Sequence, residues 1–166
     1  MSSLNELPQK GTYTLIVFVL DKTKVNVGKL GVKTFPQGYY TYTGSAFGTG
    51  ASSLPCRVSR HLNREKKKRW HIDFLLADKS VTVESIVAIV GKRKLECQVN
   101  QLINKQMQAR ILVPRFGASD CLNHCGSHLL YIGNMDAKSK IYKLFQQKFG
   151  RKSIFIDLSM SSLLKA

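Results

Sequence analysis

The segment 12-TYTLIVFVL-20 decides the fold, because it is apolar at nearly every position and rich in β-branched and aromatic residues. Such an unbroken run predicts a central strand that is buried on both faces of a sheet. The segment that follows, 25–38, carries three glycines and one proline among short apolar runs and predicts a hairpin insert. A second strand is expected at 39-YYTYTG-44. The connection is so short that antiparallel pairing of the two strands is the natural outcome.

A helix is predicted after the small-residue loop 45–53, since Ser52 or Ser53 can cap it and Pro55 falls in its first turn. Two stripes run along this helix. The apolar stripe that faces the core consists of Leu54, Val58 and Leu62. The neighbouring polar stripe consists of Arg57, His61 and Arg64.

Apolar periodicity predicts the remaining elements. The expected strands are 81–90, 111–117 and 128–133. The expected helices are 95–108 and one that is capped by Asp136 and ends at Gly150. The segment 153–159 is expected to be either a last strand or an appended piece.

The mixed order of these elements predicts an α+β fold, with a small, largely antiparallel sheet flanked by helices. We expect a polar lead at 1–10, a core domain at 11–133, and a C-terminal helix and strand at 134–166 that pack on the core or are appended to it. A length of 166 residues with 43% hydrophobic content is enough to bury a core.

The chain is strongly basic, with 26 lysines and arginines against 10 aspartates and glutamates, for a net charge of +16. A surplus of this size favours phosphate-rich partners such as nucleic acid, although a generally basic cellular setting is the alternative. The first residues resemble no signal peptide, and no stretch of 18 apolar residues occurs. The four cysteines are too few and too unevenly spaced for a disulfide framework. We therefore expect a cytoplasmic or nuclear protein without a membrane partner.

Five polar residues lie on the predicted strands and helices and are candidate site residues. Tyr13 starts the first strand, Tyr42 ends the second, and Arg57 and His61 lie one turn apart on the helix. Glu96 opens a later helix. Each has an ordinary interpretation: strand tyrosines pack, a helix face is solvated, and a glutamate favours a helix N-terminus.

Six ordered blocks between residues 11 and 133 contain these residues: GTYTL, GYYTYTGSA, RVSRH, WHIDFLL, EC and FGASDCLNHCGSHL. Together they resemble an uncharacterised branch of the GIY-YIG nuclease superfamily. The resemblance implies a metal-dependent endonuclease that hydrolyses DNA phosphodiesters. It implies a catalytic set of Tyr13, Tyr42, Arg57, His61 and Glu96.

The roles that the resemblance implies are chemically reasonable. Glu96 would hold Mg²⁺ or Mn²⁺, and Arg57 would contact the phosphate. His61 would orient Tyr13 or a water molecule. A phenol with a pKa of about 10 is a poor base, so Tyr13 needs a neighbouring cation. The alternative is a non-catalytic nucleic-acid-binding module of the same fold.

Two basic runs, 64-REKKKR-69 and 91-GKRK-94, lie close in sequence to the helices with Arg57 and Glu96. Either run alone is an ordinary solvated surface, but both together favour a groove that follows phosphates with weak sequence specificity. The candidate nucleic-acid contacts are Arg60, Arg64, Lys66, Lys67, Lys68, Arg69, Lys92, Arg93 and Lys94.

The segment 117–128 presents Cys121-x3-Cys125-x2-His128, with Cys97 and His124 as further candidate ligands. Thiolates and imidazole suit zinc, although the spacing matches no strong zinc template. A zinc site, a redox dithiol and ordinary packing or capping all remain open. Ser119 and Asp120 could approach the substrate or support the site, and their role is left unassigned.

Overall fold

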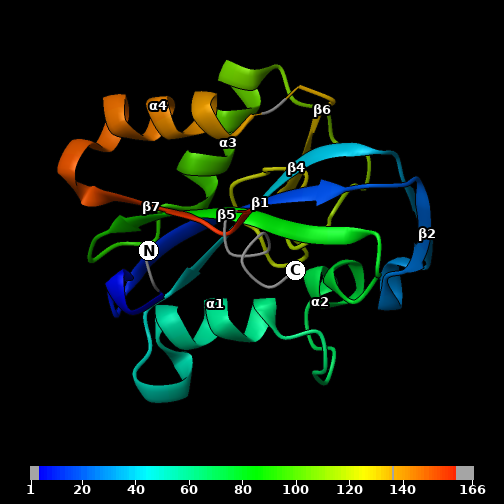
Figure 1. Cartoon of the computed structure of the whole chain (residues 1–166), viewed down its shortest axis with the longest axis horizontal. Coiled ribbons are helices and arrows are strands. Elements are labelled where there is room, and N and C mark those ends of the chain that lie inside the picture. The colour runs from blue at the N-terminus through cyan, green and yellow to red at the C-terminus, as the bar shows by residue number, and fades with distance from the viewer. Residues whose placement is uncertain (1–3, 136, 160–166) are drawn as a thin grey trace.

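The structure, a computed structural model, describes residues 4–135 and 137–159. Its centre is a five-stranded sheet in the order β6-β4-β1-β5-β7, in which every neighbouring pair is antiparallel (Figure 1). The strands are β1 (Gly11–Val19), β4 (Gly38–Ala46), β5 (Val81–Val90), β6 (Leu129–Gly133) and β7 (Ser153–Asp157). A separate hairpin pairs β2 (Thr23–Asn26) with β3 (Val32–Phe35). The predicted hairpin insert and the predicted α+β class are confirmed.

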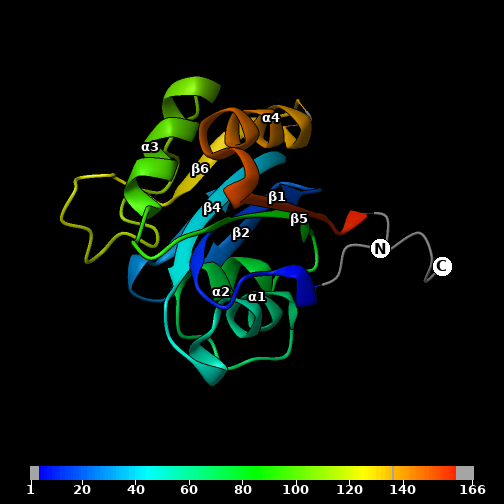
Figure 2. The same ribbon diagram turned by 90° about the vertical axis from the view of Figure 1, so that its left-hand side faces the viewer.

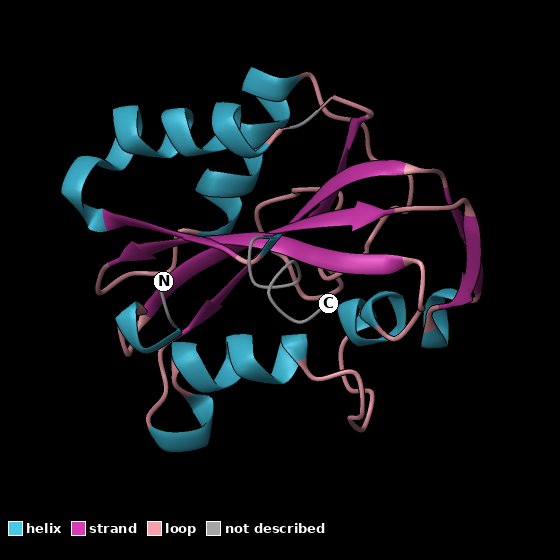
Figure 3. Cartoon of the chain, in the orientation of Figure 1, coloured by secondary structure: helices cyan, strands magenta, loops and turns pink. Residues whose placement is uncertain are grey.

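Helices cover both faces of the sheet, with α1 and α2 on one side and α3 and α4 on the other (Figures 1–3). Their bounds are α1 (Leu54–Leu62), α2 (His71–Leu76), α3 (Glu96–Met107) and α4 (Lys138–Phe149). Within the described residues, the short 3-10 turns are η1 (Leu4–Glu6), η2 (Gly28–Leu30), η3 (Gly50–Ser52) and η4 (Gly150–Lys152).

Strand β1 lies in the middle of the sheet and is buried along almost its whole length, as predicted. Its side chains alternate between two hydrophobic cores, because successive residues of a strand point to opposite faces. Leu15 and Val17 belong to the core under α1 and α2, whereas Ile16 belongs to the core under α3 and α4.

Helix α1 begins as predicted: the Ser53 hydroxyl accepts a hydrogen bond from the Cys56 amide at 3.5 Å, and a proline occupies the first turn. Leu54 and Val58 are buried, which confirms the apolar stripe. His61 was expected on a polar stripe, but only 2% of it is exposed. The rings of Tyr13 and Trp70 pack against it and exclude water.

The predicted strand at 111–117 is wrong. Its neighbour Arg110 forms a single bridge with Tyr131, and the segment itself consists of turns. Arg115 and Gly117 have φ angles of 67° and 66°, and Pro114 has no amide hydrogen to donate to a ladder. The apolar residues of this segment enter the core from a loop instead, as Phe116 does.

The C-terminal part of the chain joins the main sheet. Helix α4 ends before Gly150, whose φ of 55° suits glycine, as predicted. The proposed cap Asp136 lies outside the described residues. The segment 153–157 pairs with β5, so it is a last strand of the sheet. Among the helices of 4–135 and 137–159, none has the length and hydropathy that a bilayer span requires.

Candidate functional site

The candidate site lies where strand β6 stops pairing with β4. The last pair between these strands joins Tyr42 to Leu129, so β6 leaves 43–46 of β4 without a strand partner on that side. Just before β6, the carbonyl oxygen of His128 accepts a hydrogen bond of 3.2 Å from the amide of Thr43. The start of β1, the end of β4 and the end of β5 all meet here, because Gly11 pairs with both Ala46 and Val90.

Tyr13 is hydrogen-bonded to His61, with 2.7 Å between its hydroxyl oxygen and Nε2 of the imidazole. Its ring lies across Gly44 on the neighbouring strand. A Cβ atom at Gly44 would come within 2.6 Å of the Tyr13 hydroxyl oxygen, so only glycine leaves room for the ring. Gly11 is equally restricted, because a Cβ there would lie 2.3 Å from the carbonyl oxygen of Ile89. The glycines of the two tyrosine motifs therefore have a packing role.

Both tyrosines are neutral phenols at neutral pH. Burial, followed by repulsion between the phenolate forms of Tyr13 and Tyr42 and by the charge of Glu96, raises the pKa of Tyr13 well above its ordinary value, and the nearby Arg57 opposes this only in part. Burial and the charge of Glu96 likewise raise the pKa of Tyr42. The cation expected beside Tyr13 is thus present, but it does not offset the cost of desolvating a phenolate.

His61 is a neutral imidazole, because burial lowers its pKa to about 3 against the attraction of Asp73. A neutral imidazole carries one N–H, and the position of that proton decides which nitrogen accepts. Nδ1 has no hydrogen-bond partner in the described part of the chain, and it lies 4.0 Å from Oδ1 of Asp73. The carboxylate favours a proton on Nδ1, which makes Nε2 the acceptor of the Tyr13 hydroxyl proton.

Asp73, on α2, is a site residue that the sequence motifs did not reveal. It is fully buried, and its carboxylate accepts two hydrogen bonds of 2.9 Å from the guanidinium of Arg60. The amides of Arg69 and Trp70 donate two more, at 2.8 and 3.0 Å. Burial alone would raise the pKa of Asp73, but these hydrogen bonds lower it below its ordinary value. The sequence signal that could have identified Asp73 is its position as an acidic residue within the apolar run WHIDFLL, directly after a basic run.

Arg57 and Glu96 are connected through Ser45, a second residue that the sequence motifs did not reveal. Arg57 donates a hydrogen bond of 2.6 Å to the carbonyl oxygen of Ser45, and the Ser45 hydroxyl donates to Oε1 of Glu96. The Glu96 side chain remains 26% exposed. Arg57 also stacks on Trp70, with 5.0 Å from its Cζ atom to the ring centre.

The five predicted catalytic residues are therefore brought together at this end of the sheet. His61 contacts both phenols, with ring centres 5.6 Å from Tyr13 and 6.1 Å from Tyr42. Arg57 and Glu96 lie close enough to act electrostatically on both phenols.

Two hollows adjoin the group and share Arg69 and Trp70. One, of about 450 Å³, is strongly basic. It is lined by Ala51, Ser52, Arg57, Arg60, Lys67, Arg69 and Trp70. The other, of about 370 Å³, contains the only acidic lining residue of the two, Asp120, together with Ser119 beside Tyr42. The two residues left unassigned thus lie next to the candidate site.

The predicted nucleic-acid contacts fall into two groups. Arg64 donates to the carbonyl oxygens of Asp78 and Val81 at 2.9 and 2.7 Å, and Lys66 donates to that of His61 at 2.8 Å. These two side chains, like Arg60, hold the fold together. Arg64 is nevertheless exposed, as are Lys67, Lys68, Arg69, Lys92, Arg93 and Lys94. Lys68 also lies over the ring of Phe74.

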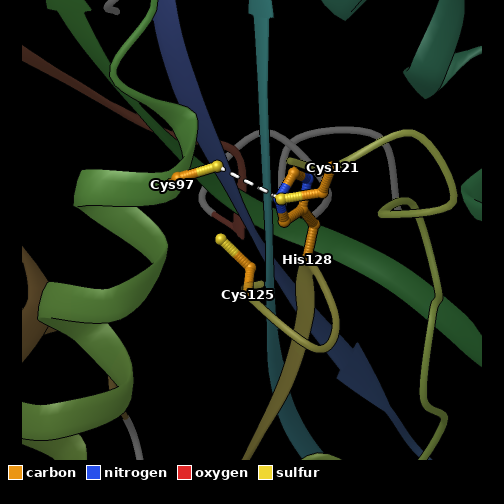
Figure 4. Close-up of side chains that lie close together, drawn as sticks. All are labelled: Cys97, Cys121, Cys125 and His128. Atoms are coloured by element: carbon orange, nitrogen blue, oxygen red, sulfur yellow. Dashed lines mark hydrogen bonds between the residues drawn. The ribbon is translucent and has the colours of Figure 1, made fainter. Parts of the chain in front are cut away.

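Four of the predicted metal ligands gather beside Glu96. The ligand atoms of Cys97, Cys121, Cys125 and His128 all lie within 4.8 Å of one another, and their side chains converge in Figure 4. This cluster can hold a metal ion such as zinc. His124 is exposed and does not belong to the described cluster.

One thiol of the cluster favours the thiolate form that binds metals. Burial would raise the pKa of Cys121, but hydrogen bonds from the main chain of Cys125 and Asn123 and from Cys97 bring it to about 6. Burial and the neighbouring thiols raise the pKa of Cys125 to about 12. Cys121 is therefore the first of these two thiols to ionise.

Comparison with known proteins gave one result. No curated protein and no solved structure matches the chain. A family described as a domain of unknown function, DUF123, matches residues 12–150, which include the tyrosines, the helix with Arg57 and His61, Glu96 and the cysteine cluster. The chain belongs to the DUF123 family.

Proposed function

We propose that the chain is a metal-dependent, endonuclease-like protein that hydrolyses DNA phosphodiesters with weak sequence specificity. One observation carries the proposal. The hydrogen-bonded pair of Tyr13 and His61 lies beside the chain of contacts from Arg57 through Ser45 to Glu96. Phosphodiester hydrolysis needs a proton acceptor, a cation for the phosphate and a carboxylate for a metal, and these side chains can supply all three.

Glu96 is the residue that would hold Mg²⁺ or Mn²⁺. Its Oε1 accepts from Ser45, and its partly exposed carboxylate can still offer an oxygen to a hard cation. Mg²⁺ is often bound by one or two carboxylates, with water and substrate phosphate in the other positions. A bound metal would stabilise negative charge on the phosphate. With a single carboxylate supplied here, we expect the cation to bind mainly together with the DNA.

Proton transfer would run along buried groups. As the attacking water gives a proton to the hydroxyl oxygen of Tyr13, Tyr13 can pass its own proton to Nε2 of His61, so that no buried phenolate forms. The imidazolium formed would lie beside the Asp73 carboxylate, 4.0 Å from Nδ1. Asp73 stays ionised because Arg60 and two main-chain amides bind it, so it can stabilise that positive charge without taking the proton.

The basic hollow supports a phosphate-binding role. Arg57, Lys67 and Arg69 line it, together with Arg60, whose guanidinium is paired with Asp73. Cations recognise the phosphate backbone irrespective of base sequence, which is the basis for the proposed weak specificity.

The test is cleavage of supercoiled, nicked and branched DNA by the purified chain with Mg²⁺ or Mn²⁺. Glu96→Gln should abolish cleavage and leave DNA binding intact. Glu65→Gln, at an exposed glutamate in the loop after α1, is the matched control and should cleave like the wild type. Equal cleavage by Glu96→Gln would assign the activity to another site or a contaminant.

A second candidate, a non-catalytic DNA-binding module of this fold, is favoured by the burial of the phenols. Tyr13 and Tyr42 are only 2% and 8% exposed, so little of either phenol is open to a substrate. This alternative predicts tight, salt-dependent DNA binding by the wild type and no cleavage of any of the three substrates. The cysteine cluster favours a third candidate, a zinc or redox protein, which stoichiometric zinc or a native disulfide in the purified chain would support.

A further inference from the structure

We propose that Cys97, Cys121, Cys125 and His128 form a structural zinc site that fastens the loop before β6 to the first turn of α3. His128 would also link this site to Glu96. The proposed importance of that link for hydrolysis rests on the proposed function, whereas the zinc site does not.

The spacing of the ligand atoms fits joint coordination of one ion. In a tetrahedral site with zinc–sulfur bonds of about 2.3 Å, the sulfur atoms lie about 3.8 Å apart. The Cys97 and Cys121 sulfurs lie 3.4 Å apart, and the Cys97 sulfur lies 3.9 Å from Nε2 of His128. All four ligand atoms share one small volume, whereas a disulfide would use only two of them.

The ligands come from two segments that are distant in sequence. Cys97 lies in the first turn of α3, and the other three ligands lie in a loop (Figure 4). The described segment 111–128 contains no helix or strand. A segment of this length without secondary structure needs another source of order inside a compact domain, and a structural zinc ion supplies it.

Two of the four ligands are buried, and the other two are partly exposed. Cys125 and His128 are only 7% and 5% exposed. Side chains of α3 brace the loop around the cluster: Asn100 donates to the carbonyl oxygen of Ser127 at 2.7 Å, and Gln101 donates to the sulfur of Cys125 at 3.8 Å. Four protein ligands fill a tetrahedron and leave no position for substrate.

His128 is oriented to connect the cluster with Glu96. Its Nε2 faces the sulfur of Cys97, and its Nδ1 lies 3.9 Å from Oε2 of Glu96. Histidine ligands of zinc usually direct their second N–H to a carboxylate or carbonyl oxygen, which fixes the ring. The ion would thus restrain Glu96 twice, through His128 and through the adjacent Cys97.

The experiment is metal analysis of the full chain purified under reducing conditions, with zinc in the growth medium. We expect one zinc per chain in the wild type and a loss of most of it in Cys97→Ser and Cys121→Ser. Cys56→Ser is the matched control, because Cys56 is exposed and outside the cluster, and it should retain the zinc. Replacement of zinc by Co²⁺ should give the visible absorption of a tetrahedral thiolate site.

The wild type alone keeps the inference testable if the serine variants do not fold. A chelator should then remove the zinc and accelerate limited proteolysis within 111–128. A zinc-free wild type would overturn the inference, as would a disulfide between Cys97 and Cys121 in the native protein or unchanged proteolysis after zinc removal. Glu96→Gln should keep its zinc while it loses cleavage, so failure of the zinc site and failure of the proposed nuclease are distinguishable.

Discussion

Lowering the pH should destabilise the protein through His61. Burial lowers the pKa of the folded imidazole to about 3, whereas its ordinary value is 6.5. Above pH 6.5, His61 is neutral in both the folded and the unfolded chain, so it does not change the free energy of unfolding. As the pH falls from 6.5 towards 3, the unfolded chain binds a proton that the folded chain does not, so stability is lost throughout this range.

The size of the effect follows from the two pKa values. Between pH 7 and pH 5 the difference in proton binding removes about 2 kcal/mol of unfolding free energy. Asp73 does not interfere, because its ordinary value of 3.8 is lowered further in the fold and its stabilisation is lost only at lower pH.

The assay is urea unfolding across this pH range for the wild type and for His61→Gln. Glutamine can still accept the Tyr13 hydrogen bond but does not titrate. The remaining ionisable groups, including His71 and the excess of positive charge, are common to both proteins and cancel in the comparison. The wild type should lose about 2 kcal/mol more than the variant between pH 7 and pH 5. Equal losses in the two proteins would refute the reasoning, since His61 would then be protonated as easily in the fold as outside it.

Two further substitutions test the packing of Tyr13 and the basic hollow. Gly44→Ala places a Cβ 2.6 Å from the Tyr13 hydroxyl oxygen and should cost about 1–3 kcal/mol in urea unfolding. Gly91→Ala is its control and should be nearly neutral, because among the described residues no atom lies within 4 Å of the added carbon; an equal cost for both would contradict the packing role of Gly44. Lys67→Ala with Arg69→Ala should weaken duplex DNA binding and reduce the slope of log affinity against log salt by about 0.9 for each phosphate that is no longer neutralised. Lys24→Ala, at an exposed lysine of the β2–β3 hairpin, should leave that slope unchanged, and a similar change there would indicate a general charge effect.

The elements of the fold were largely predictable from local sequence. The run 12–20 indicated a central strand because it is apolar at nearly every position, as strands covered on both faces are. Ser53 and Pro55 marked the start of α1. The segment 111–117 misled the same reasoning, because its apolar residues enter the core from turns rather than from a sheet.

The sequence predicted five members of the candidate site, but not Asp73, Ser45 or the contacts between the side chains. Helical spacing placed Arg57 and His61 on one side of α1, yet only the packed structure buries His61 between Tyr13 and Trp70 and sets Asp73 behind it. Spacing within the sequence also gave no strong zinc template, because Cys97 is far from the other ligands along the chain.

The amino-acid sequence by itself determined most of the strands, the start of α1 and the identity of the polar residues, because these depend on patterns within a few residues. Only the tertiary structure decided which nitrogen of His61 faces Asp73, which carbonyl Arg57 binds and which thiols meet His128. Such contacts depend on strand register and loop closure, which place residues side by side that are distant in sequence. Burial among those neighbours, rather than local pattern, then sets the protonation of the phenols and the imidazole.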